Sequence, residues 1–214
     1  MVSDDRERTD FSPTDSPEFG RGVSYFDAVY GFAATLLIAN VDSVPPEAWR
    51  DLHALLSSDV LGQLVGFFLS FAVIALFWRV SVRCLRAMTG LDGPTTAISL
   101  VATALIVLIP FTTQGISDPA SADLPLPTAV YAVNVALAAL AHSAVFVVAA
   151  TRGLLRQPLD AARLRAAMLD YALTPAIFLL SIPLAFWVDP AVAQLSWLSL
   201  AVLLPLSGRR AERG

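Results

Sequence analysis

Few side chains in the apolar parts of this sequence could do chemistry. Asp27 and His142 are the ionisable residues that lie well inside apolar runs, where a charge is costly and therefore often functional. Asp170 and Asp189 lie at the ends of such runs, where water can reach them. No pair of carboxylates, no Cys/His metal set and no Ser/His/Asp group falls at one depth. The sequence therefore predicts no catalytic residue, no metal site and no cofactor, and an enzyme is the least favoured class.

Each of these residues also has a structural interpretation. Asp27 either caps the start of its helix near Arg21 or fixes that helix against neighbours that line a pathway. For His142 we expect a buried imidazole that hydrogen-bonds a neighbouring helix, because an unpaired polar group inside a membrane is costly. The single cysteine, Cys84, is expected to pack as a small apolar residue.

The composition places these residues in a membrane. The chain of 214 residues is 56% hydrophobic and 15% charged, with a mean hydropathy of +0.66, whereas soluble domains carry about 25% charged residues. About 20 apolar residues cross a bilayer core as a helix. Six runs approach that length: Val23–Val41, Val60–Trp78, Ala97–Ile116, Leu126–Ala150, Tyr171–Val188 and Pro190–Ser207. We therefore predict an all-α membrane protein with six transmembrane helices.

The arginines predict the orientation of these helices. The chain has no lysine, and 13 of its 14 arginines fall before the first run, after the last, or between runs two and three or four and five. Arg50 alone falls on the other side, together with most of the loop aspartates. The positive-inside rule then places both termini in the cytoplasm of a multi-pass protein of the cell inner membrane. The net charge of −4 gives no support to nucleic-acid binding.

The same pattern divides the chain into three parts. Residues 1–20 are polar and acidic and are expected to form a disordered tail. Residues 21–208 form the membrane domain, and residues 209–214 a short basic cytoplasmic tail. Within the outer loop 42–59, Glu47 to Leu56 could form a short amphipathic helix with Trp49 at the membrane interface.

A resemblance to a known family begins in the first run. The stretch from Arg21 to Ile38, RGVSYFDAVYGFAATLLI, resembles the opening helix of the transmembrane-protein-175 family of potassium channels. Arg21 and Asp27 stand in register with the family motif, as do Thr35, Leu36 and Leu37. Later matches are Phe77-Trp78, Pro110-Phe111-Thr112, and Tyr131 with Asn134. Each motif alone is weak, and their order along the chain makes the resemblance fairly specific.

The resemblance implies a homotetramer that passes potassium ions through the lipid bilayer. In the family, the first helix of each subunit lines a central pore whose constriction is a ring of apolar side chains. The constriction position corresponds to Phe32, and the same helical face carries Ala28, Thr35, Leu36 and Ala39. Such a stripe could instead simply pack against other helices, as most small-residue membrane faces do.

The sequence departs from the family pattern at several positions of this motif. The motif network implied by the resemblance is carried here by Arg21, Tyr25, Phe26 and Asp27, with Tyr25 and Phe26 in the places of a phenylalanine and a serine. Ser81 and Val82 stand where paired histidines are common. A non-conducting scaffold or interaction protein on the same fold is therefore the alternative to a potassium channel. A small-molecule transporter is weaker, because the two halves show no matching pair of broken helices.

Overall fold

The computed structural model describes residues 11–200, and most of them are helical. The helices are α2 (Pro17–Leu36), α3 (Leu52–Leu56), α4 (Val60–Ala87), α5 (Gly93–Val107), α6 (Ile109–Ser117), α7 (Pro125–Thr151), α8 (Ala161–Trp187) and α9 (Pro190–Ser196). Two short 3-10 helices, η1 (Leu37–Asn40) and η2 (Pro46–Trp49), follow α2. The strands β1 (Ser12–Pro13) and β2 (Gly90–Leu91) pair antiparallel.

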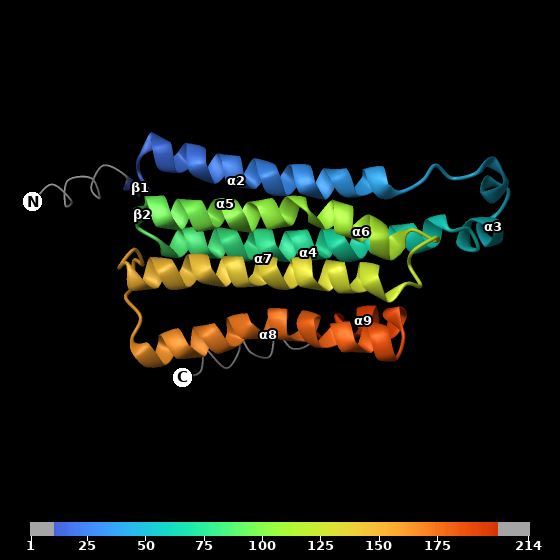
Figure 1. Cartoon of the computed structure of the whole chain (residues 1–214). Coiled ribbons are helices and arrows are strands. Elements are labelled where there is room, and N and C mark those ends of the chain that lie inside the picture. Colours follow the sequence, from blue (N-terminus) through green and yellow to red (C-terminus); the bar gives the residue numbers. More distant parts are fainter. Residues whose placement is uncertain (1–10, 201–214) are drawn as a thin grey trace, which may run out of the picture.

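Five segments of the described chain are long and apolar enough to cross a membrane. They are Pro17–Asn40, Val60–Ala87, Gly93–Ser117, Pro125–Thr151 and Ala161–Trp187. They lie side by side along one axis, with α2 on one flank, α4 to α7 in the middle and α8 on the other flank (Figure 1). These spans make the chain a multi-pass membrane protein. Of the expected sixth span, Pro190–Ser207, α9 and the residues up to Leu200 are described, and the remainder lies outside the described residues.

Several helices extend beyond the apolar runs that predicted them. α4 continues past Trp78 to Ala87 through three arginines, and α8 begins at Ala161, ten residues before Tyr171. Asp160 caps α8 by accepting a hydrogen bond from the backbone N–H of Arg163 at 2.7 Å. A hydropathy pattern stops at the first charges, whereas backbone hydrogen bonding continues until a cap or a breaker ends it. These arginines therefore lie on helical turns rather than in loops.

The segment before α2 also differs from the expectation. Residues 11–20 are not part of a disordered tail, because they contain β1 and the first turn of α2. Ser16 caps α2 by accepting from the backbone N–H of Phe19 at 3.2 Å, with Pro17 in the first helical position. The predicted tail residues 1–10 and the predicted basic tail 209–214 lie outside the described residues.

Two other elements are interrupted where one helix was expected. The third span breaks into α5 and α6 at Leu108, two residues before Pro110, whose ring and missing N–H disrupt a continuous helix. In the outer loop, η2 and α3 replace a single helix from Glu47 to Leu56. Asp51 takes an extended conformation there and caps α3 through the backbone N–H of Ala54 at 2.8 Å.

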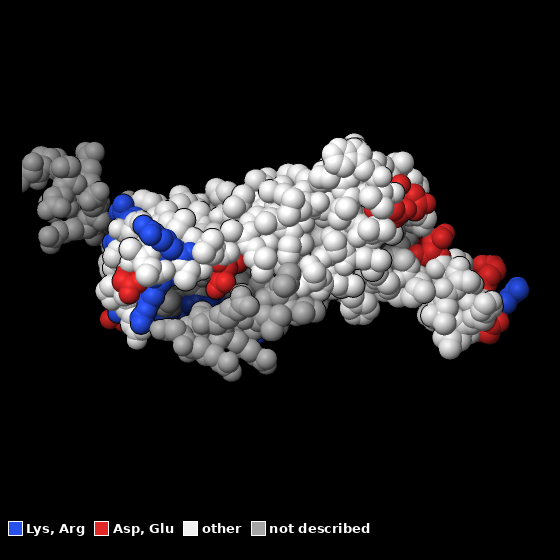
Figure 2. Space-filling model, turned by 90° about the horizontal axis from the view of Figure 1, so that it is seen from below, with Lys and Arg blue, Asp and Glu red and all other residues white. Residues whose placement is uncertain are grey.

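The two ends of the molecule carry opposite charge. Eight of the nine described arginines gather at the end where α2, α5 and α8 begin, called here the arginine end. The opposite, acidic end carries aspartates together with Glu47 and Arg50 (Figure 2). The helices therefore alternate in direction between two chemically distinct ends.

Candidate pore-lining helix

The two faces of α2 differ in burial. Phe26, Tyr30, Ala33 and Leu37 are buried, and their three- and four-residue spacing places them on one face that packs against the other helices. On the other face, Ala28, Phe32, Thr35 and Ala39 are exposed, and Phe32 is 61% exposed. The face that the family resemblance implies for a pore is therefore largely exposed in the described part of the chain.

Two residues expected on that exposed face of α2 differ from the others. Leu36 is only partly exposed because it lies toward the buried side of the helix. Ala39 falls in η1, since the α-helical hydrogen bonding ends at Leu36, but it remains exposed. The Thr35 hydroxyl donates to the carbonyl of Phe32 at 2.8 Å, so its oxygen still has lone pairs that can accept.

The residues of the expected motif network are not brought together as one network. Phe26 is buried among Cys84, Leu85 and Met88, while Tyr25 is 55% exposed and touches the Phe26 ring edge-on. Arg21 is exposed and forms no ion pair with any described residue. The capping interpretation that placed Arg21 beside Asp27 is therefore not what the structure shows.

Asp27 instead ties α2 to α4. Its carboxylate accepts a hydrogen bond from the indole N–H of Trp78 at 2.9 Å. The two residues lie at one end of an open groove of about 380 Å³ between the helices, which is lined by small residues such as Gly31, Ala34 and Ala75. The structure thus supports the interpretation in which Asp27 fixes the first helix against a neighbour.

A second tie joins the buried face of α2 to α7. The Tyr30 hydroxyl hydrogen-bonds Nε2 of His142, and Nδ1 of His142 bonds the Ala138 carbonyl at 2.6 Å. The imidazole also stacks on Phe77 of α4, with ring centroids 4.9 Å apart. The expectation of a buried imidazole bonded to another helix is confirmed. Tyr30 was not singled out from the sequence, although a buried histidine must find a partner and Tyr30 lies one turn from Asp27.

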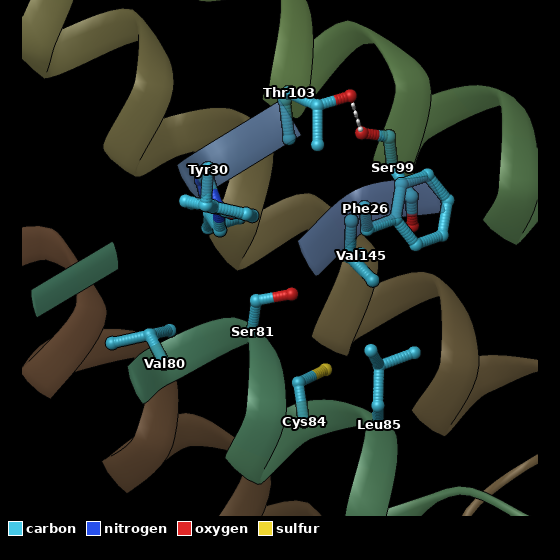
Figure 3. Close-up of a pocket in the computed structure, with 11 residues that line it drawn as sticks. Phe26, Tyr30, Val80, Ser81, Cys84, Leu85, Ser99, Thr103 and Val145 are labelled. Carbon is cyan, nitrogen blue, oxygen red and sulfur yellow. Dashed lines mark hydrogen bonds between the residues drawn. The ribbon is translucent and has the colours of Figure 1, made fainter. Parts of the chain in front are cut away.

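A small cavity with a mainly apolar lining and a few hydroxyl groups lies behind this pair. It has a volume of about 20 Å³ and is bounded by α2, α4, α5 and α7, which is room for about one water molecule. Hydroxyl groups of Ser81, Ser99 and Thr103 line it, and Cys84 lines it too, buried as expected (Figure 3). The Thr103 hydroxyl donates to the Ser99 carbonyl at 3.0 Å. Ser81, at a position where the family pattern has histidine, thus contributes a hydroxyl beside an imidazole that comes from α7.

Polar contacts also hold the acidic end of this first span. The Asn40 side chain donates to the carbonyl of Pro110 at 2.6 Å. Asp42 and Gln63 pair twice, once through the Asp42 backbone N–H and once through its carboxylate, both at 2.7 Å. Together with the Trp78 and His142 contacts, these bonds hold the chain from Asp27 to Asp42 against α4, α6 and α7.

At the arginine end, one buried carboxylate organises the start of α5. Asp92 caps α5 through the backbone N–H of Thr95 at 2.9 Å and forms an ion pair with Arg152 after α7. Burial by itself raises the pKa of Asp92, but the hydrogen bonds from Thr95 and Arg152 outweigh it and hold that pKa below its ordinary value. This pair joins α5 to the end of α7.

Comparison with known proteins identifies the same segment. Residues 21–110 match the family model described as "Endosomal/lysosomal potassium channel TMEM175", which covers α2 to the start of α6. No curated protein sequence matches the chain. The family described by that model is one of channels rather than enzymes.

A comparison of folds covers the rest of the chain as well. The structure is similar to a crystal structure described as a "lysosomal potassium-selective channel TMEM175 homolog" from Chamaesiphon minutus, with a TM-score of 0.70 and 22% sequence identity. The match covers 92% of this chain and 99% of that chain. At this identity the match shows a shared fold, while the match over residues 21–110 concerns the sequence itself. Residues 21–110 are therefore similar in sequence to the TMEM175 family, and the chain as a whole shares the fold of a TMEM175 homolog.

Proposed function

We propose that this protein is a subunit of a potassium-permeable channel in which four copies place the exposed face of α2 around a common axis. The observation that carries the proposal is the exposure of Ala28, Phe32, Thr35 and Ala39 on a helix that is fixed by hydrogen bonds on its other sides. The family model and the solved relative, both described as potassium channels, supply the ion.

The chemistry of this face suits a hydrophobic constriction. Four Phe32 rings around one axis would form an apolar ring, and apolar constrictions gate ion flow by dewetting. Thr35 lies about one turn further along and would add a ring of hydroxyl oxygens, which can substitute for part of the hydration shell of a cation. In this proposal Phe32 controls passage and Thr35 contacts the ion.

The proposed orientation follows from charge. The arginine end lies in the cytoplasm and the acidic end outside, in the inner membrane of the cell. If the residues after Leu200 complete a sixth span, both termini lie in the cytoplasm. Aspartates at the outer end would raise the local concentration of cations near the pore entrance.

Potassium flux into liposomes tests the proposal. Reconstituted wild-type protein should pass potassium, and Phe32→Ala should raise the flux by about tenfold or more, since a dewetting barrier falls steeply as the ring widens. Phe111→Ala is the matched control, because Phe111 is 71% exposed but lies on α6, and its flux should equal that of wild type.

Two results would reject parts of this proposal. Absence of flux in both wild type and Phe32→Ala, with tetramers present in the membrane, would favour the non-conducting scaffold. Equal gains in Phe32→Ala and Phe111→Ala would instead show that the constriction lies elsewhere. Cysteine cross-linking at position 32 would then show whether the four helices meet at all.

A further inference from the structure

One face of α4 changes from apolar to positively charged residues along its length. Its residues recur every three or four positions, all are exposed, and together they form what we call the α4 stripe: Leu61, Val65, Phe68, Ala72, Leu76, Arg79, Arg83 and Arg86. The first five are apolar and the last three are arginines. The stripe differs from the side of α4 that carries Trp78 and faces α2.

The dimensions of the stripe match those of a membrane. From Leu61 to Leu76 the helix rises by about 22 Å, which fits within a hydrocarbon core roughly 30 Å thick. From Arg79 to Arg86 it rises by about 10 Å, comparable to the headgroup region of one leaflet. Trp78, 43% exposed, lies at the junction, where aromatic residues favour the membrane interface.

The three arginines have no carboxylate partner in the part of the chain that the structure describes. The ion pairs found there join Arg152 to Asp92 and Arg163 to Asp160. Within the triplet, Arg83 Nε donates to the carbonyl of Arg79 at 3.4 Å, which leaves its terminal N–H groups as further donors. Like charges one turn apart on a helix repel, so an anion placed between them would stabilise this end of α4.

We propose that the α4 stripe binds an anionic phospholipid, with the phosphate held by Arg79, Arg83 and Arg86 and an acyl chain lying along Phe68, Ala72 and Leu76. Guanidinium groups bind phosphate through paired N–H donors. Basic groups at the end of a membrane helix are a recurrent way of recognising anionic lipid headgroups. The apolar turns of α4 that precede the arginines would contact the acyl chain, while the arginines contact the headgroup.

Charge complementarity favours a lipid over a second copy of the chain. The arginine end carries eight arginines of the described chain against six acidic residues, Asp15, Glu18, Asp27, Asp92, Asp160 and Asp170 (Figure 2). Another copy in the same orientation would therefore bring net positive charge toward the triplet. An anionic lipid neutralises the triplet and covers the apolar turns with one molecule.

Thermal unfolding of the full chain in a zwitterionic detergent measures this binding. Titration with palmitoyl-oleoyl-phosphatidylglycerol should raise the Tm at lower concentrations than phosphatidylcholine with the same acyl chains. Arg79→Gln/Arg83→Gln should weaken the apparent affinity for phosphatidylglycerol by about tenfold or more, since each basic residue contributes about 1 kcal/mol near an anionic surface. The control Arg163→Gln/Arg165→Gln removes the same charge at the same end and should change it by less than about twofold.

Other titrations distinguish the source of the phosphate. Inorganic phosphate and dihexanoyl-phosphatidylglycerol should shift the Tm less than the long-chain lipid, because neither covers the apolar turns. Equal shifts with phosphatidylglycerol and phosphatidylcholine, equal losses in the two double variants, or full competition by inorganic phosphate would each overturn the proposal. A changed oligomeric state in Arg79→Gln/Arg83→Gln with unchanged lipid affinity would identify the stripe as an interface between copies instead.

If Arg79→Gln/Arg83→Gln does not accumulate in the membrane, a second double variant tests the lipid site. Arg79→Lys/Arg83→Lys preserves the charge that directs membrane insertion but loses the paired donors of arginine. It should still prefer phosphatidylglycerol to phosphatidylcholine, with a severalfold weaker affinity than wild type. Loss of all preference would contradict a charge-based site.

Discussion

The buried and exposed faces of α2 differ in where their contacts come from. The buried face meets groups that the same chain supplies, such as His142 for the Tyr30 hydroxyl. The exposed face carries Phe32 and Thr35, most of whose surface the described chain leaves uncovered or only partly covered. Phe26 and Phe32 lie on one helix and are 3% and 61% exposed. The buried face is therefore explained by the folding of one subunit, and the exposed face requires something outside it.

Exposure alone does not identify a pore face, because membrane lipid accepts apolar side chains as readily as a protein core does. The α4 stripe is also exposed, yet it consists mainly of bulky residues such as Leu61, Val65 and Phe68. The exposed face of α2 instead combines small residues and a hydroxyl group around one phenylalanine. That composition suits contact with other helices and with ions better than contact with acyl chains.

The largest difference should appear when the same residue type is removed from each environment. Phe77 is 7% exposed and stacks on His142. Phe77→Ala should lower the unfolding free energy by about 3 kcal/mol or more, because the cavity that the ring leaves is enclosed. Phe32→Ala should change the stability of the subunit by less than about 0.5 kcal/mol. Unfolding in mixed micelles, followed by circular dichroism, measures both. Similar losses in the two variants would mean that the exposed face also contributes to the subunit fold.

The pairing of Tyr30 with His142 should show the next largest effect. Tyr30→Phe leaves Nε2 of His142 without its partner in a buried site, which should destabilise the protein by about 1 kcal/mol. Tyr25→Phe is the control, because Tyr25 lies on the same helix and is 55% exposed, and it should have almost no effect.

A double-mutant cycle tests the pair directly. Combining Tyr30→Phe with His142→Leu should cost less than the sum of the two single changes, since the second change removes the unsatisfied group. Strict additivity would show that the hydrogen bond does not contribute to stability.

The contrast between the two faces also separates what the sequence could predict from what it could not. The three- and four-residue spacing of Ala28, Phe32 and Thr35 predicted one shared face, because helical geometry is local. Whether that face packs inside or remains exposed depends on contacts far along the chain. The partner of Tyr30 is 112 residues away, and no local pattern connects the two positions.

Helix ends were predicted less well than helix cores for a related reason. Hydropathy located the apolar centre of α8 but not its first ten residues, which contain Arg163 and Arg165. Those turns are set by the Asp160 cap, and a charged turn of a helix resembles a loop in composition. The break at Leu108 similarly depends on how the chain accommodates Pro110, for which a bend or a complete interruption are both possible.

A smaller effect is expected at the boundary between the two faces. Trp78→Phe removes the hydrogen bond to Asp27 but keeps most of the aromatic surface, and it should cost about 1 kcal/mol or less because both residues are exposed. Trp187→Phe is the control, since Trp187 is 85% exposed at the other end of the molecule. Equal effects of the two changes would show that the Asp27 contact does not hold α2 against α4.

The smallest effect on stability should come from Thr35, where the proposed function predicts a change in flux instead. Thr35→Val keeps the shape of the side chain and removes a hydroxyl whose hydrogen bond is made within its own helix, so the unfolding free energy should change by less than about 0.5 kcal/mol. Potassium flux should nevertheless fall severalfold, because a ring of oxygens beside the constriction becomes apolar. Thr35→Ser, which restores the hydroxyl, should recover most of the flux. Wild-type flux in Thr35→Val would mean that the ion does not contact this turn of α2, and it would leave Phe32 as the residue of the exposed face through which passage is controlled.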